Sequence, residues 1–115
     1  MATKREVETK LRELIRRLAE TDEGVNALSD ALPDPRVIEV YVTDLDAAYW
    51  SELAEGRMGA LKRGRADRAD MRLEASSDDL VDVLDGRRSM FSSYIAGRVK
   101  VEASFADIMR LRKLA

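Results

Sequence analysis

The segment from Ala69 to Leu114 constrains the fold more than any other part of this chain, because its hydrophobic period changes repeatedly within a short length. Apolar residues alternate with polar ones in Asp70–Ala75 and again in Arg98–Glu102, as in half-buried strands. In the two stretches between these strands, and in the stretch that follows them, apolar residues recur at the three- and four-residue intervals of a helix. Strands and amphipathic helices in this order predict an α+β domain with helices packed on one face of a sheet.

Residues that commonly begin or end helices lie at the boundaries between the predicted elements of this segment. Ser76 and Ser89 each precede a helical stretch, where a serine hydroxyl can accept from the free backbone amides of the first turn. Gly86 and Gly97 follow these stretches, at the position where a left-handed residue commonly ends a helix. Ser104 precedes the last stretch in the same way, so the order of the elements is well defined.

The N-terminal half of the chain is less regular. An amphipathic helix is expected over Lys4–Glu20, and the turn residues of Thr21–Pro35 predict a loop. Val37–Val42 is rich in β-branched residues and predicts a strand. We expect Glu39 and Tyr41 to lie on the face of that strand opposite its core-facing valines and isoleucine.

Thr43–Gly56 fits both a helix and a strand, and its periodicity alone slightly favours the helix. Arg57–Arg68 is rich in basic residues and is expected to form a solvated hairpin. It contains no aromatic side chain on which a nucleic-acid base could stack, which argues against a nucleic-acid interface.

Composition excludes several classes of function. A chain of 115 residues with 45% hydrophobic residues and a net charge of −2 is expected to form a single globular domain over residues 1–115. The charge predicts no nucleic-acid partner and at most a transient membrane contact. No apolar run suits a membrane span or a secretory signal, and cysteine is absent, so a cytoplasmic location is expected. Because histidine and cysteine are both absent, we expect no catalytic triad, no metal site and no cofactor.

The C-terminal two thirds of the chain resemble the sterol carrier protein type 2-like, or non-specific lipid-transfer, domain. The residues that carry the resemblance are Ala69–Ala75, Ser77–Leu80, Leu84–Gly86, Phe91 and Ala96–Glu102. The resemblance implies a sheet of about five mostly antiparallel strands, with helices on one face, enclosing an apolar cavity. It also implies that Ala48–Ala54 is a strand, and we adopt that assignment over the helical one.

The same resemblance implies non-catalytic binding and carriage of an apolar lipid, which could be a fatty acid, an acyl-CoA or a sterol-like molecule. Methionines and aromatic residues at helical spacing are more often plain core, and only the resemblance favours a cavity wall. The expected ligand-binding residues are Trp50, Leu84, Met90, Phe91, Tyr94, Ile95, Phe105, Ile108 and Met109. The helical residues among them are expected to face the sheet, and Trp50 joins them if its side of the strand is the inner one. The oligomeric state stays open.

The alternative is an accessory or catalytic subunit that acts on an acyl-CoA or lipid substrate. Four aspartates, Asp78, Asp79, Asp82 and Asp85, would be its candidate general bases. Three of them share a polar helix face opposite the apolar stripe, so exposure and ordinary carboxylate chemistry are expected.

Overall fold

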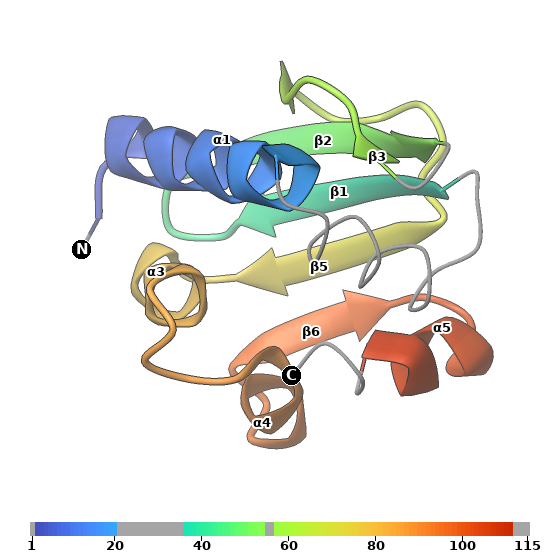
Figure 1. Cartoon of the computed structure of the whole chain (residues 1–115). Coiled ribbons are helices and arrows are strands. Elements are labelled where there is room, and N and C mark those ends of the chain that lie inside the picture. The colour runs from blue at the N-terminus through green and yellow to red at the C-terminus, as the bar shows by residue number, and fades with distance from the viewer. Residues whose placement is uncertain (1, 21–35, 55–56, 112–115) are drawn as a thin grey trace.

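In the computed structural model of the chain, one twisted sheet is packed against helices (Figure 1). The structure describes residues 2–20, 36–54 and 57–111, so the predicted loop at residues 21–35 lies outside the described part. The elements are, in chain order, α1 (Lys4–Glu20), β1 (Arg36–Val42), β2 (Ala47–Ala54), β3 (Arg57–Met58), β4 (Lys62–Arg63), β5 (Met71–Ala75), α3 (Ser77–Leu84), α4 (Met90–Ile95), β6 (Val99–Glu102) and α5 (Phe105–Leu111).

The sheet is mixed, with strands in the order β3-β2-β1-β5-β6. β1 and β5 run parallel, and the other neighbouring pairs are antiparallel. The two-residue strand β4 also pairs with β2, at the end of β2 away from β3. The α+β class is therefore confirmed, with six strands rather than about five because the outer edge of β2 carries two short ones.

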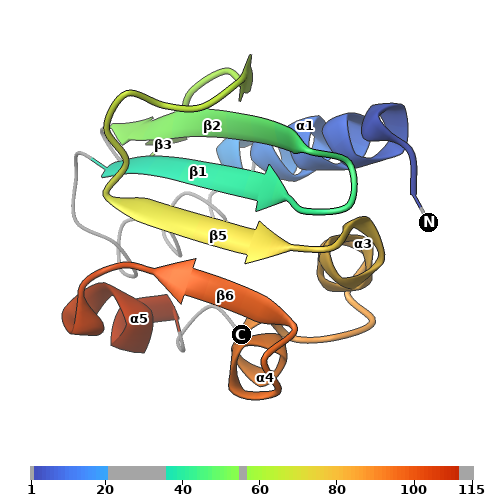
Figure 2. The same ribbon diagram turned by 180° about the vertical axis from the view of Figure 1, so that it is seen from behind.

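The two faces of the sheet differ in what covers them. α1 crosses the face that we call inner, over β1 and β2 (Figure 1). Figure 2 shows the opposite, outer face, which none of the described helices crosses. The strand prediction for Ala48–Ala54 is confirmed, since β2 spans Ala47–Ala54 and pairs with β1 along its full length.

Each predicted helix cap is present. The Ser76 hydroxyl accepts from the Asp79 amide at 3.2 Å, and Ser89 accepts from the next helix in the same way. Ser104 accepts from the Asp107 amide at 3.1 Å. Gly86 and Gly97 both adopt φ of +77°, the left-handed conformation expected after a helix.

Gly97 gives a test of this turn. A valine there should lower the free energy of unfolding by about 1–2 kcal/mol, because a β-branched residue is strained at positive φ. The neighbouring Ala96 is exposed and has an ordinary φ of −75°, so Ala96→Val is the matched control and should cost less than about 0.5 kcal/mol. Urea denaturation measures both. Equal stabilities of the two variants would contradict the assignment of strain to Gly97.

The inner face carries two separate groups of buried apolar side chains. The first cluster lies at the end of the sheet next to α3 and consists of Ala2, Val7, Leu11, Val42, Tyr49, Ala75, Leu80, Val81 and Val99. The second cluster, Leu53 and Met71, lies nearer the start of β1. α1 reaches both, since Leu11 belongs to the first cluster and Leu18 packs against the second.

Candidate functional site

An incompletely buried apolar row separates the two clusters. Val40, Leu73 and Val101 stand in register on β1, β5 and β6, so their side chains point from the inner face. All three are half-buried, and on β5 the inner-face neighbours of Leu73, which are Met71 and Ala75, are both buried. Val101 packs against the first and the second cluster alike. We call these three residues the middle row.

Part of the predicted site packs against the first cluster, as two residues of the middle row do. Leu84 of α3 and Met90 of α4 are half-buried and pack against the first cluster, as Val40 and Val101 do. These four side chains are all apolar, and that of Met90 is also a flexible thioether. Such a surface can bind a hydrocarbon and offers nothing that could polarise or protonate one.

Three further predicted residues are half-buried. Phe91 and Tyr94 share α4, with their ring centroids 6.3 Å apart. Ile108 lies on α5. α4 packs against β6, which brings this helix to the edge strand of the sheet.

The prediction that Ile95, Phe105 and Met109 face the sheet is wrong. Their exposed fractions are 68%, 78% and 39%. Asp107 of α5 is buried instead, and its carboxylate accepts from Arg36 Nε at 3.1 Å. At ~100° per residue, Asp107 lies on the opposite side of the helix from Phe105 and Met109, so this ion pair directs both apolar side chains outward.

Trp50 is also misplaced by the sequence-based prediction. The register pairs it with Glu39, which puts both residues on the outer face. Its ring lies under the Lys62 ammonium, 4.4 Å from Nζ to the centroid. Trp50 therefore lies across the sheet from the middle row.

Glu39 is the buried group that the sequence-based reasoning missed. Only 1% of it is exposed. Its carboxylate accepts from the Ala66 amide at 2.7 Å, from Arg65 Nη1 at 3.1 Å and from Arg72 Nε at 3.0 Å. The alternation of β1 correctly placed Glu39 on the outer face, but the segment that leads from β4 to β5 folds over that face and buries it.

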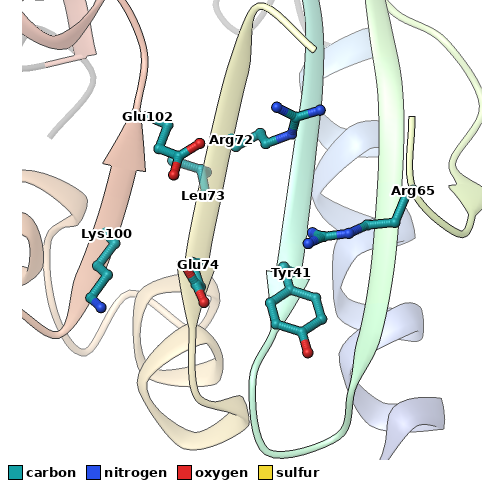
Figure 3. Close-up of a pocket in the computed structure, with 7 residues that line it drawn as sticks. All are labelled: Tyr41, Arg65, Arg72, Leu73, Glu74, Lys100 and Glu102. Atoms are coloured by element: carbon teal, nitrogen blue, oxygen red, sulfur yellow. The ribbon is translucent and has the colours of Figure 1, made fainter. Parts of the chain in front are cut away.

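A polar pocket of about 70 Å³ lies beside this group on the outer face (Figure 3). Its lining is Tyr41, Arg65, Arg72, Leu73, Glu74, Lys100 and Glu102. The Arg65 guanidinium stacks over the Tyr41 ring at 4.4 Å. A hydrogen bond from the Tyr41 hydroxyl to Asp46, 2.7 Å long, raises the pKa of the tyrosine. With charges of both signs around it, this pocket does not suit an apolar tail.

A second pocket, of about 200 Å³, lies between α1 and α3 and is polar as well. Lys10 Nζ stands 2.6 Å from Asp85 in its wall. Neither of these two pockets is the apolar cavity that the sequence resemblance implies.

The aspartates of α3 are engaged in ion pairs rather than presented as bases. Arg87 bonds Asp82 at 2.9 Å and holds the pKa of that carboxyl below its usual range. Lys10 does the same for Asp85. A lowered pKa makes a carboxylate a weaker base, so these two groups depart from the ordinary chemistry expected of them and are poor candidates for proton abstraction.

Residues 2–20, 36–54 and 57–111 contain neither a candidate metal-binding cluster nor a helix suited to cross a membrane. Within these ranges no cluster of three or more histidine, cysteine, aspartate or glutamate side chains could hold a metal ion. None of the helices described there has both the length and the apolar character needed to cross a membrane.

A mixed sheet with α1 across one face and a half-buried apolar row on that same face defines an α+β class of domain with an apolar inner surface. Residues 8–115 match the SCP-2 sterol transfer family. The chain belongs to this family. No curated protein matches it.

Solved structures with the same fold share little sequence with the chain. Sterol carrier protein 2 like 2 from Aedes aegypti has a TM-score of 0.68 at 13% identity, with 95% of each chain covered. A ubiquinone synthesis protein, UbiJ-SCP2, has a TM-score of 0.66 at 16% identity, covering 99% of this chain and 91% of that one. A stereoselective inverting sec-alkylsulfatase from a Pseudomonas species matches 73% of this chain at a TM-score of 0.58 and 14% identity. The match spans only 13% of that larger protein.

Proposed function

We propose that this chain binds and carries an apolar lipid, either a fatty acid, an acyl-CoA or a sterol-like molecule, without catalysing a reaction on it. The lipid would lie along the inner face of the sheet, between the strands and the helices. One observation carries the proposal. Leu73 of the middle row is only half-buried although its inner-face neighbours on β5, Met71 and Ala75, are buried, whereas a close-packed core would enclose all three.

The magnitudes suit a hydrocarbon ligand. A tail of about 16 methylenes gains roughly 12 kcal/mol when buried, at ~0.8 kcal/mol for each methylene. Immobilising the ligand costs several kcal/mol of this gain. The remainder corresponds to an affinity of about micromolar or better without any ionic contact. Because one methylene changes binding by only about 1–3 kcal/mol, we expect broad selectivity among tails.

Native mass spectrometry of the freshly purified protein tests this function directly. We expect a mass above that of the apo chain, and solvent extraction should release the bound lipid for identification. Purified apo protein should also take up cis-parinaric acid, a fluorescent fatty acid, with saturation at one ligand for each chain. If neither a co-purified lipid nor uptake of the probe is found, lipid carriage is overturned.

A pair of variants on β6 locates the ligand. Val101→Trp places bulk in the middle row, and we expect it to weaken cis-parinaric acid binding about tenfold or more while thermal stability falls by less than about 1.5 kcal/mol. The matched control is Lys100→Trp, since Lys100 is exposed and points from the outer face. The control should bind as the wild type does. Ordinary close packing at Val101 would instead give a large loss of stability, with the loss of binding only following it.

A second candidate function is that of an accessory subunit that presents a lipid to an enzyme. The observation in its favour is the likeness over almost the full length of both chains to UbiJ-SCP2, which is described as a ubiquinone synthesis protein. An accessory role needs the same lipid site and adds a protein partner. A catalytic role would give turnover of an acyl-CoA by the purified chain, and Asp82→Asn would then reduce it. We expect no turnover, because the ion pairs described above occupy the candidate bases.

A further inference from the structure

α4 buries a serine and exposes an isoleucine. Ser93 is 2% exposed, whereas Ile95, two residues later, is 68% exposed. Burial of apolar surface alone would favour the reverse arrangement. The helix is therefore oriented so that a hydroxyl, rather than a larger apolar side chain, enters the interior.

The buried hydroxyl of Ser93 has no hydrogen-bond partner within the part of the chain that the structure describes. Other buried serines are satisfied: Ser51 Oγ donates to the Gly59 carbonyl at 2.7 Å, and Ser77 Oγ donates to Asp44 at 2.7 Å. A buried polar atom without a partner carries the full cost of its desolvation, and such atoms are rare in folded proteins. Departures of this kind concentrate at functional sites.

Ser93 lies on the side of α4 that faces the proposed lipid. Met90 is one turn earlier on the same side of the helix and packs against the first cluster, as Val101 does. α4 itself packs against β6, the strand that carries Val101. The hydroxyl thus enters the apolar interior from a helix that packs against the strand carrying Val101.

We propose that Ser93 Oγ is the hydrogen-bond partner of a neutral hydroxyl head group on the carried lipid. This inference rests on the proposed function. A serine hydroxyl both donates and accepts, and so pairs well with an alcohol. None of the buried residues of the described part is lysine or arginine. A carboxylate buried beside Ser93 would therefore lack a counter-ion, which is costly.

The test compares two tetraene probes that share one fluorescent tail. The first is the alcohol that corresponds to cis-parinaric acid, and the second is the hydrocarbon of the same length. The variants are Ser93→Ala and the matched control Ser92→Ala, which removes an exposed hydroxyl from the same helix. Affinity is measured by fluorescence titration, and each variant is also melted to monitor its fold.

We expect the wild type and Ser92→Ala to bind the alcohol more tightly than Ser93→Ala does, by about five- to tenfold. The hydrocarbon should bind all three proteins equally. The melting temperature of Ser93→Ala should equal or exceed that of the wild type, because the substitution removes an unpaired buried hydroxyl.

Two outcomes overturn the inference alone. One is equal affinity of Ser93→Ala and wild type for the alcohol, and the other is a clear fall in the melting temperature of Ser93→Ala, which would show that the hydroxyl stabilises the fold. If the wild type binds neither the alcohol, the hydrocarbon nor cis-parinaric acid, then the proposed function fails as well. The two failures are thus distinguished by the wild-type titrations.

Discussion

Replacing Glu39 by alanine should lower the free energy of unfolding by about 3 kcal/mol, measured by urea denaturation. The substitution leaves the buried Ala66 amide without its acceptor and removes the anion shared by Arg65 and Arg72. Both arginines are partly exposed, and their charges are screened by water. Most of the loss should therefore come from the unsatisfied amide and the space left by the side chain.

Glu39→Gln separates these contributions, because the amide oxygen of glutamine can still accept from Ala66. We expect this variant to lose about 1–2 kcal/mol. Glu52 provides the control, as an exposed glutamate on the outer face of the neighbouring strand, and Glu52→Ala should change stability by less than about 0.5 kcal/mol. If Glu39→Ala and Glu52→Ala were equally stable, Glu39 would have no role in holding the β4–β5 connection to the sheet.

Asp44→Ala should cost about 2 kcal/mol. Asp44 lies in the turn between β1 and β2 and accepts from both the amide and the hydroxyl of Ser77, each at 2.7 Å. Ser77 is fully buried at the start of α3, so without Asp44 its donors would be unsatisfied. Differential scanning calorimetry would measure the loss. An exposed aspartate, Asp67, serves as the control, and Asp67→Ala should change stability by less than about 0.5 kcal/mol.

The same contact predicts how stability depends on pH. The hydrogen bond from Ser77 lowers the pKa of Asp44 in the folded state. At a pH between the pKa values of Asp44 in the folded and unfolded states, the unfolded chain binds more protons than the folded protein does. The free energy of unfolding therefore falls as the pH drops through this range. The contribution of Asp44 is thus complete above about pH 5 and disappears as the pH falls through the folded pKa. Asp44→Asn should therefore show a shallower loss of stability in acid than the wild type. Parallel curves would contradict this assignment.

Local features of the sequence predicted the element order well. Each serine cap and each left-handed glycine depends on residues within about one turn, so the sequence around Ser76 or Gly97 contains the whole interaction. The alternation in Met71–Ala75 likewise fixes which side chains share a face. The choice of a strand over a helix for Ala48–Ala54 was not local, and it came from the family resemblance rather than from periodicity.

The errors arose where a distant partner decides the outcome. Asp107 is buried on α5 because Arg36 supplies a counter-ion from the start of β1, and no helical pattern within residues 105–111 encodes that pairing. Trp50 is on the outer face because the register of β2 against β1 puts it beside Glu39. For Leu84 and Met90, in contrast, the apolar stripe of each helix was sufficient to place them near the core.

The docking of α1 has a consequence for the order of events during synthesis. The Ala2 amide donates to Ser77 Oγ across 75 positions of sequence, and Val7 is buried in the same cluster as Leu80. At about 5–20 residues per second, Ser77 leaves the ribosome roughly 4–15 s after Ala2 does. During that interval a nascent chain presents the apolar side of α1 without its helical partner. α1 is thus synthesised well before the helix that encloses it, and in the meantime its amphipathic surface is available to a chaperone.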